Sequence, residues 1–73
     1  MLTDQEKQDL IDAGEDYARD NQDLGLNDLE GCARDLAAGS VEDETLLDVA
    51  ADYIYEGMVK TRARELAEEA KGY

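Results

Sequence analysis

Apolar residues recur every three or four positions along this chain, which is the spacing of one face of an α-helix. The first such stripe comprises Leu10, Ile11, Gly14, Tyr17 and Ala18. The 73 residues include no proline, and Ala, Leu, Glu and Asp far outnumber the β-branched residues. That composition favours helices over strands. We therefore predict an all-α fold, a small bundle of three or four helices in a single acidic domain over residues 1–73.

Capping motifs predict where the helices begin and end. Thr3 and Glu6 have the spacing of a capping box, in which each side chain bonds to the backbone N–H of the other residue. They should open a helix that runs from about residue 4 to about residue 21. Further caps are expected at Asn27 with Glu30, at Gly39, and at Ser40 with Asp43.

The apolar pattern of the third expected helix changes phase after Gly57. Before this glycine, a broad apolar face carries Leu46, Leu47, Val49, Ala50, Tyr53, Ile54 and Met58. After it, a second stripe consists of Val59, Ala63, Leu66, Ala70 and Tyr73. At about 100° per residue the two stripes point well apart, so one straight helix cannot bury both against the same neighbour. We expect either a bend or break near Gly57, or packing of the last segment on a second chain as a homodimer.

Acidic residues are concentrated in the front of the chain. The whole sequence has 20 acids and 7 bases, a net charge of −13. Residues 1–57 hold 17 acids and 3 bases, which gives −14, whereas residues 58–73 hold 3 acids and 4 bases, which gives +1. This balance excludes nucleic-acid binding through a basic patch and disfavours anionic membrane surfaces. A basic protein is the expected partner.

The acids form rows four positions apart on two of the expected helices. The rows are Asp12, Asp16 and Asp20 on the first helix and Glu44, Asp48 and Asp52 on the third. Like charges at this spacing destabilise a helix by about 0.2–0.5 kcal/mol per pair. The bases nearby have acids four positions earlier, in the pairs Glu15 and Arg19, Glu30 and Arg34, and Glu56 and Lys60. The aspartates of the rows are thus expected to lack a basic partner.

The rows have the spacing of a charged polymer strand. Four helical residues rise about 6 Å, the same order as the separation of successive phosphates along a nucleic-acid strand, whose axial rise is about 3.4 Å. Two such rows could imitate two strands. Tyr55 falls among Glu44, Asp48 and Asp52 on a helical wheel rather than with the core residues, and an aromatic ring there can stack on a partner's arginine. The expected partner-binding residues are therefore Asp12, Asp16, Asp20, Glu44, Asp48, Asp52 and Tyr55.

Catalytic and metal-binding chemistry lacks the residues it needs. The chain has no histidine, one serine and one cysteine, so no nucleophile and base can be paired. The stretch "DNQDLG" at residues 20–25 starts like an EF-hand loop, but Gln22, Leu24 and Gly31 stand at positions three, five and twelve, where the loop requires stronger ligands. Cys32 lies on an apolar helix face and is expected to be a core thiol. We expect no enzyme activity, no cofactor and no metal.

In size, charge and lack of catalytic motifs the chain resembles small phage-encoded anti-CRISPR and anti-restriction proteins that act as DNA mimics. The resemblance is one of composition, covers the whole chain and involves no diagnostic motif. It implies a cytoplasmic inhibitor that binds the basic groove of a DNA- or RNA-binding protein in a prokaryotic defence complex, and binds no nucleic acid itself. The alternative is a helical interaction or dimerisation module whose acidic surface serves solubility, as in salt-loving organisms.

Overall fold

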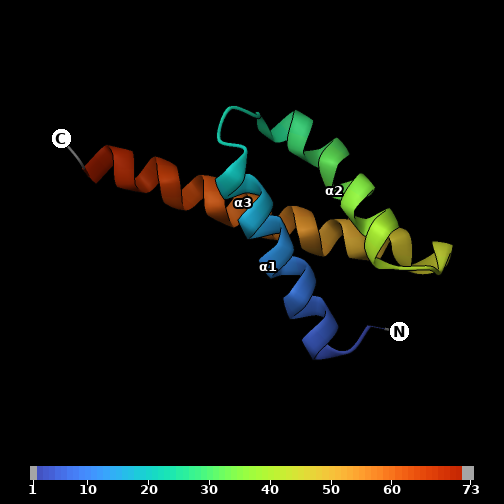
Figure 1. Ribbon diagram of the computed structural model, residues 1–73. Helices are drawn as coiled ribbons and strands as arrows, with labels where there is room; N and C mark the ends of the chain where they lie inside the picture. Colours follow the sequence, from blue (N-terminus) through green and yellow to red (C-terminus); the bar gives the residue numbers. More distant parts are fainter. Residues whose placement is uncertain (1, 72–73) are drawn as a thin grey trace.

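Three α-helices make up the computed structural model, which describes residues 2–71 (Figure 1). The helices are α1 (Asp4–Asp20), α2 (Leu26–Ser40) and α3 (Glu44–Lys71). Residues 2–71 contain no strand. The prediction of an all-α fold is confirmed, with three helices rather than four.

The longest helix, α3, is the centre of the molecule. Both α1 and α2 pack against α3 and barely touch each other. In Figure 1, α1 crosses the middle of α3, α2 lies over its first half, and the last part of α3 projects beyond both. The molecule is accordingly elongated, with extents of 46, 23 and 15 Å along its principal axes.

Small side chains dominate the hydrophobic core. The largest fully buried side chains are Leu29, Ile54 and Met58. Among residues 2–70, half of the ten buried hydrophobic residues are alanines, namely Ala18, Ala33, Ala37, Ala50 and Ala51. Because alanine adds little width to a helix, such a core lets the helix axes approach closely.

A reciprocal pair of glycines allows a close approach where α1 crosses α3. A Cβ atom added to Gly57 would lie 2.0 Å from the carbonyl oxygen of Ile11, and one added to Gly14 would lie 1.9 Å from that of Ile54. The two backbones therefore pack directly on each other. Of the alternatives expected for this region, a break near Gly57 is wrong, since α3 continues through this residue. The glycine serves helix packing instead of helix termination.

The two apolar stripes of α3 differ in burial, because they point in different directions from the helix. Ala50, Ile54 and Met58 from the first stripe are buried, although Val49 is 42% exposed, contrary to our expectation. In the second stripe, Leu66 is 64% exposed and the other described members are exposed as well. Tyr73 lies outside the described residues. Packing of this second stripe on another chain remains a prediction.

The cap of α1 agrees with the sequence, but that of α2 does not. The backbone N–H of Glu6 donates to Thr3 Oγ1 and that of Thr3 donates to Glu6 Oε1, both at 3.1 Å, which confirms the capping box. In contrast, α2 begins at Leu26 after an extended Gly25. Asn27 therefore lies inside the helix, and the cap expected there is wrong.

The junction between α2 and α3 also differs from the expectation. Gly39 is not a terminal cap, because α2 continues through Ser40. The Ser40 hydroxyl donates to the carbonyl oxygen of Leu36 at 2.8 Å, so it does not cap α3. Asp43 takes that role, since its Oδ1 accepts from the backbone N–H and the hydroxyl of Thr45 at 2.9 and 2.8 Å. These bonds lower the pKa of the Asp43 carboxyl.

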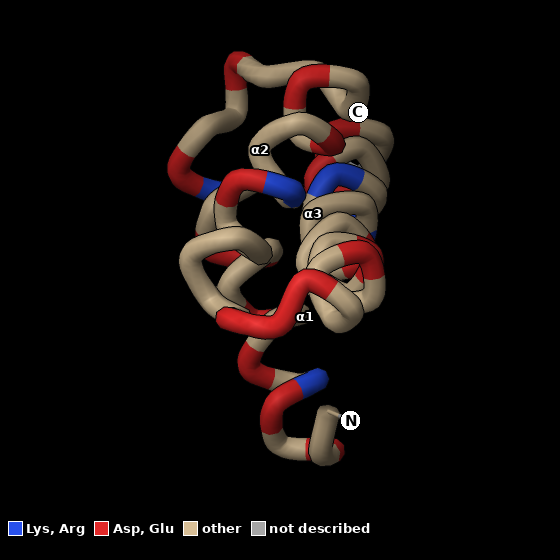
Figure 2. The backbone as a smooth tube through the Cα atoms, turned by 90° about the vertical axis from the view of Figure 1, so that its right-hand side faces the viewer, with Lys and Arg blue, Asp and Glu red and all other residues tan. Residues whose placement is uncertain are grey.

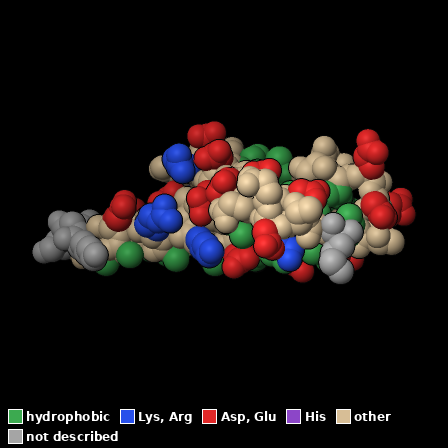
Figure 3. Space-filling view, turned by 90° about the horizontal axis from the view of Figure 1, so that it is seen from below, with side chains coloured by type: hydrophobic (Ala, Val, Ile, Leu, Met, Phe, Trp, Pro, Cys, Tyr) green, Lys and Arg blue, Asp and Glu red, His purple; other side chains and the backbone are tan. Residues whose placement is uncertain are grey.

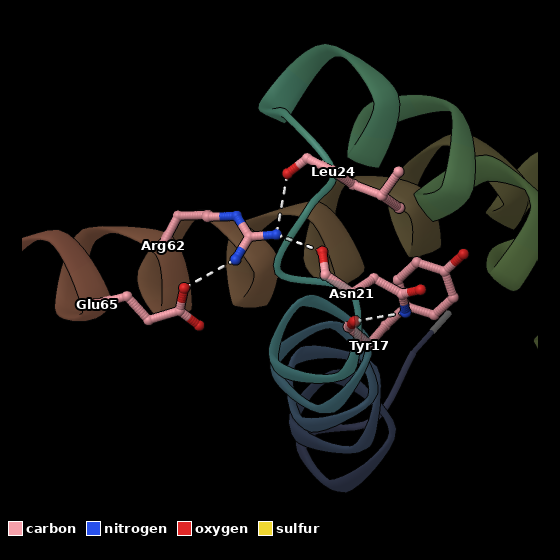
Figure 4. A network of polar contacts seen from close by, with 5 residues as sticks. All are labelled: Tyr17, Asn21, Leu24, Arg62 and Glu65. Carbon is pink, nitrogen blue, oxygen red and sulfur yellow. Dashed lines mark hydrogen bonds and ion pairs between the residues drawn. The ribbon is translucent and has the colours of Figure 1, made fainter.

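A half-buried arginine fastens the turn between α1 and α2 to α3 (Figure 4). Nη2 of Arg62 donates to the carbonyl oxygens of Asn21 and Leu24 at 2.6 and 2.9 Å. Nη1 lies 2.8 Å from Oε2 of Glu65. The Arg62 side chain is only 13% exposed. This base, which the sequence placed with the neutral tail, therefore has a structural role.

Candidate interaction surface

The acidic row of α1 faces away from the core. Asp12, Asp16 and Asp20 are all exposed. Gly14, which touches α3, lies two residues from both Asp12 and Asp16. Two residues along a helix rotate the side-chain direction by about 200°. The row therefore lies on the side of α1 opposite α3. Asp12 accepts a hydrogen bond from Gln8 Nε2 at 3.0 Å.

The acidic row of α3 lies on the flank next to α2. Glu44, Asp48 and Asp52 are exposed, and Asp48 and Asp52 border a groove between the two helices. Oδ1 of Asp48 is 2.7 Å from Nη2 of Arg34 on α2. Both side chains are more than half exposed, so this ion pair adds little to stability.

Two of the predicted base pairings are wrong. Arg34 reaches across to Asp48 instead of pairing with Glu30. Arg19 lies 3.6 Å from Asp16 rather than pairing with Glu15, so Asp16 and Asp48 are not without a base. The third pairing is confirmed, because Lys60 Nζ lies 3.8 Å from Glu56 Oε1. Within the described part of the chain, Asp12, Asp20, Glu44 and Asp52 make no ion pair.

The groove between α2 and α3 gathers charge and an aromatic ring. It encloses about 560 Å³ and opens to solvent. Its polar and aromatic lining includes Glu30, Arg34, Asp48, Asp52 and Tyr55. The three carboxylates outnumber the single guanidinium, so the groove is negative overall. Such a groove can receive a basic side chain and contact its apolar stem through the ring.

Tyr55 belongs both to the groove and to the edge of the core. We expected this ring to lie outside the core, but it is half-buried and packs against the buried cluster. It also lies beside Asp48 and Asp52 in the groove lining, as the helical wheel indicated. The helical wheel therefore predicted the acidic neighbours of Tyr55 correctly but did not predict that its ring packs against the core.

The structure does not bring the two acidic rows onto one face. α1 packs against the flank of α3 that carries Gly57, whereas α2 covers the flank with Ala51. Because the α1 row points away from α3, the two rows lie on different sides of the molecule. Figure 2 shows acidic positions on all three helices and few basic ones. Acidic residues therefore lie on more than one side of the molecule.

The one cysteine is engaged within the fold. Cys32 is half-buried on α2 and packs against the core. The Tyr17 hydroxyl donates a hydrogen bond to its Sγ at 3.3 Å. This bond raises the pKa of the Tyr17 hydroxyl. The thiol thus lies at the core, as predicted, although it is not fully covered.

Within residues 2–71, no three histidine, cysteine, aspartate or glutamate side chains are grouped so as to hold a metal ion. None of the described helices is both long and apolar enough to cross a lipid bilayer. No protein-family model, curated protein sequence or solved structure matches the chain.

Proposed function

We propose that the protein is an acidic nucleic-acid mimic that occupies the basic groove of a DNA- or RNA-binding protein and blocks it. The observation that carries this proposal is the acidic row of α3 beside the groove that contains Tyr55. Glu44 and Asp52 in this row are exposed and make no ion pair with any described residue. A partner's arginine or lysine could neutralise them without displacing an internal base.

The shape of the molecule supports the same proposal. Its short extents of 23 and 15 Å are comparable to the thickness of a nucleic-acid duplex. The phosphate rows of a duplex also lie on different sides of a rod, as do the two acidic rows here. A basic channel that surrounds a duplex could thus contact both rows, while a flat basic surface would meet only one.

The target class to examine first is a prokaryotic defence complex, such as a CRISPR effector or a restriction enzyme. The resemblance of the chain to phage-encoded inhibitors of those complexes suggests this choice. Nucleases of this kind hold their substrates in positively charged channels. The tagged full-length chain would be used to recover a basic partner from a prokaryotic lysate.

Charge reversal tests which face binds the recovered partner. We expect the double variant Glu44→Lys and Asp52→Lys to lose binding, because it places two positive charges in the row that faces the partner. It leaves Asp48 and Arg34 themselves unchanged. The matched control, Glu68→Lys with Glu69→Lys, makes the same change in net charge on the tail of α3.

Binding constants for the wild type and both variants would be measured by biolayer interferometry, after circular dichroism has shown equal helicity. The proposal predicts a loss of at least about a hundredfold for the row variant and less than about fivefold for the tail variant. Equal losses would show that only net charge matters and would contradict the assignment of this face.

A second candidate function is an interaction or dimerisation module whose acidic surface serves solubility. The exposed apolar stripe on the tail of α3 favours it, since acid mimicry does not require that stripe. Salt separates the two candidates. Binding by a nucleic-acid mimic weakens steeply as salt rises, because its contacts are between opposite charges. Apolar association between acidic chains strengthens, because salt screens their mutual repulsion.

A further inference from the structure

The projecting end of α3 exposes an apolar seam. Val59, Ala63, Leu66 and Ala70 are all exposed, Val59 to 37% and Leu66 to 64%. In Figure 3, hydrophobic side chains follow one edge of the projecting part, close to basic side chains. Exposed apolar area in one contiguous stripe is typical of a contact with another molecule.

The seam has the spacing and symmetry of a coiled-coil contact. Its members are four, three and four residues apart, which is the spacing that coiled coils use between core positions. The seam rises about 17 Å along the helix. The order of these spacings is the same from either end of the seam. An antiparallel copy would therefore present an apolar residue opposite each residue of the seam.

Charge indicates what can approach this seam. Residues 59–70 contain three bases and three acids, so the segment is neutral in a chain of net charge −13. A second copy is repelled over most of the surface and is not repelled here. Arg62 and Glu65 pair with each other within the fold, so the exposed bases are Lys60 and Arg64, and the exposed acids are Glu68 and Glu69. Antiparallel pairing therefore sets the basic half of each copy against the acidic half of the other.

We propose that two copies of this chain associate through an antiparallel pairing of residues 59–70. Val59 packs opposite the partner's Ala70, and Ala63 packs opposite the partner's Leu66. Parallel pairing would extend the seam one heptad back to Asp52 and Glu56 and would bring like charges together. Antiparallel pairing instead keeps the two acidic bodies at opposite ends of the dimer.

The seam sets the strength of the association. Three turns of helix with two alanines bury less area than the roughly 1,200 Å² that specific stable interfaces need. The dimer is therefore weak, with a dissociation constant in the micromolar range or above. Submicromolar protein, as used to measure partner binding, is monomeric.

Sedimentation velocity of the full chain between about 10 μM and 1 mM, in reducing buffer, measures this equilibrium. The wild type should shift from monomer to dimer. Leu66→Glu should raise the dissociation constant about tenfold or more, because it places a charge in the seam. Leu26→Glu makes the same change at an exposed leucine of α2 and should leave the dissociation constant of the dimer unchanged. A wild type that stays monomeric throughout, or a dimer that Leu66→Glu does not weaken, would overturn the proposal.

Cysteine cross-linking measures the orientation. The Val59→Cys variant would be made in a Cys32→Ala background. In the antiparallel dimer the two introduced thiols lie at opposite ends of the seam, about 17 Å apart along the helix axis, which is too far for a disulfide. A chain with both Val59→Cys and Ala70→Cys should form a covalent dimer. A covalent dimer of the Val59→Cys single variant would overturn the antiparallel arrangement.

Salt makes this test independent of the proposed function. The dimer should strengthen between about 50 and 500 mM salt, because the repulsion between the two acidic bodies, each −14 over residues 1–57, outweighs the few exposed opposite charges beside the seam and is screened. Binding to a basic partner weakens over the same range. Dimerisation that weakens over this range would contradict an apolar seam. If binding to the basic partner fails while dimerisation is observed, the proposed function is contradicted and the dimer is supported.

Discussion

Arg62 shows how one residue can hold a loop against a helix. Its planar guanidinium reaches two carbonyl oxygens of the turn between α1 and α2 and one carboxylate of its own helix. Lysine has a single nitrogen at the end of its side chain and cannot satisfy all three acceptors in this geometry. The sequence could not reveal this role, because the partners lie 38 and 41 residues away in the chain.

Replacing Arg62 with lysine should therefore destabilise the fold. We expect a loss of about 1–3 kcal/mol in the free energy of unfolding, since two charge-assisted bonds in a half-buried site are weakened. Urea denaturation followed by circular dichroism measures this loss. Arg64→Lys is the matched control, because Arg64 lies only two residues away and is exposed. An equal effect of both variants would contradict the assigned role of Arg62.

Asp43 is the other residue whose role is sharply defined. Its carboxylate caps α3, and the hydrogen bonds from Thr45 lower its pKa. A lowered pKa in the folded state means that the ionised form stabilises the fold. This contribution is complete above the pKa of an aspartate in the unfolded chain, about 3.9. It is lost as the pH falls through the lowered pKa of Asp43 in the folded protein.

The difference in Tm between the wild type and Asp43→Ala should follow that sign. We expect the wild type to melt higher at neutral pH and the difference to shrink below about pH 4. Thermal melts from pH 7 down to about pH 2.5 would measure it. Glu42→Ala, at the exposed neighbouring position, is the control for a loss of one negative charge. A difference that grows toward low pH would contradict the capping role of the carboxylate.

At the scale of helices, the crossing of α1 and α3 is the decisive contact. Gly14 and Gly57 allow the two backbones to touch, and a Cβ atom at either position would overlap a carbonyl oxygen. Backbone atoms cannot rotate away as a flexible side chain can. Substitution must therefore push the helices apart and weaken the packing around Ile54.

Gly57→Ala should destabilise the protein by about 3 kcal/mol or more, because the overlap with Ile11 involves backbone. This outcome is opposite to the general effect of the substitution, since alanine is the better helix former. Gly31→Ala provides the comparison: its added Cβ meets open space among the described residues, so it should stabilise the protein by about 0.5–1 kcal/mol. Chemical denaturation of both variants tests the prediction. A stable Gly57→Ala variant would contradict the close crossing.

Local signals predicted part of this architecture. The capping box at Thr3 and the helical period were read correctly, because each depends on residues within a few positions. The cap of α3 was assigned to Ser40 instead of Asp43, since several polar residues in a short loop satisfy the same local pattern. The phase change at Gly57 was visible, but a sequence cannot distinguish a broken helix from a continuous helix with an unpartnered face.

For the whole molecule, the sequence predicted the amount of charge better than its arrangement. Exposure of the acidic rows was expected, and both rows are exposed. The groove, the position of the rows on different sides and the pairing of Asp48 with Arg34 depend on how α2 packs against α3. Contacts between helices are set by the tertiary fold, so helical spacing within one element could not predict them.

Asp12 and Asp52, which lie inside their helices and make no ion pair with any described residue, should not stabilise the isolated protein. We expect the double variant Asp12→Asn and Asp52→Asn to keep its helicity and to have a Tm equal to or slightly above that of the wild type, because repulsion along each row is relieved. Raising the salt concentration should likewise raise the Tm of the wild type. A large fall in Tm for the variant would show that these carboxylates hold the fold together and are not reserved for a partner.

The most direct test of nucleic-acid mimicry is competition between this protein and a labelled duplex for the recovered basic partner. Fluorescence anisotropy of the duplex would be followed as the protein is added at submicromolar concentration and at several salt concentrations. Mimicry predicts that the protein displaces the duplex completely, that Glu44→Lys with Asp52→Lys does not, and that the inhibition constant rises steeply with salt. If duplex and protein bind the partner together without interference, the central claim is wrong.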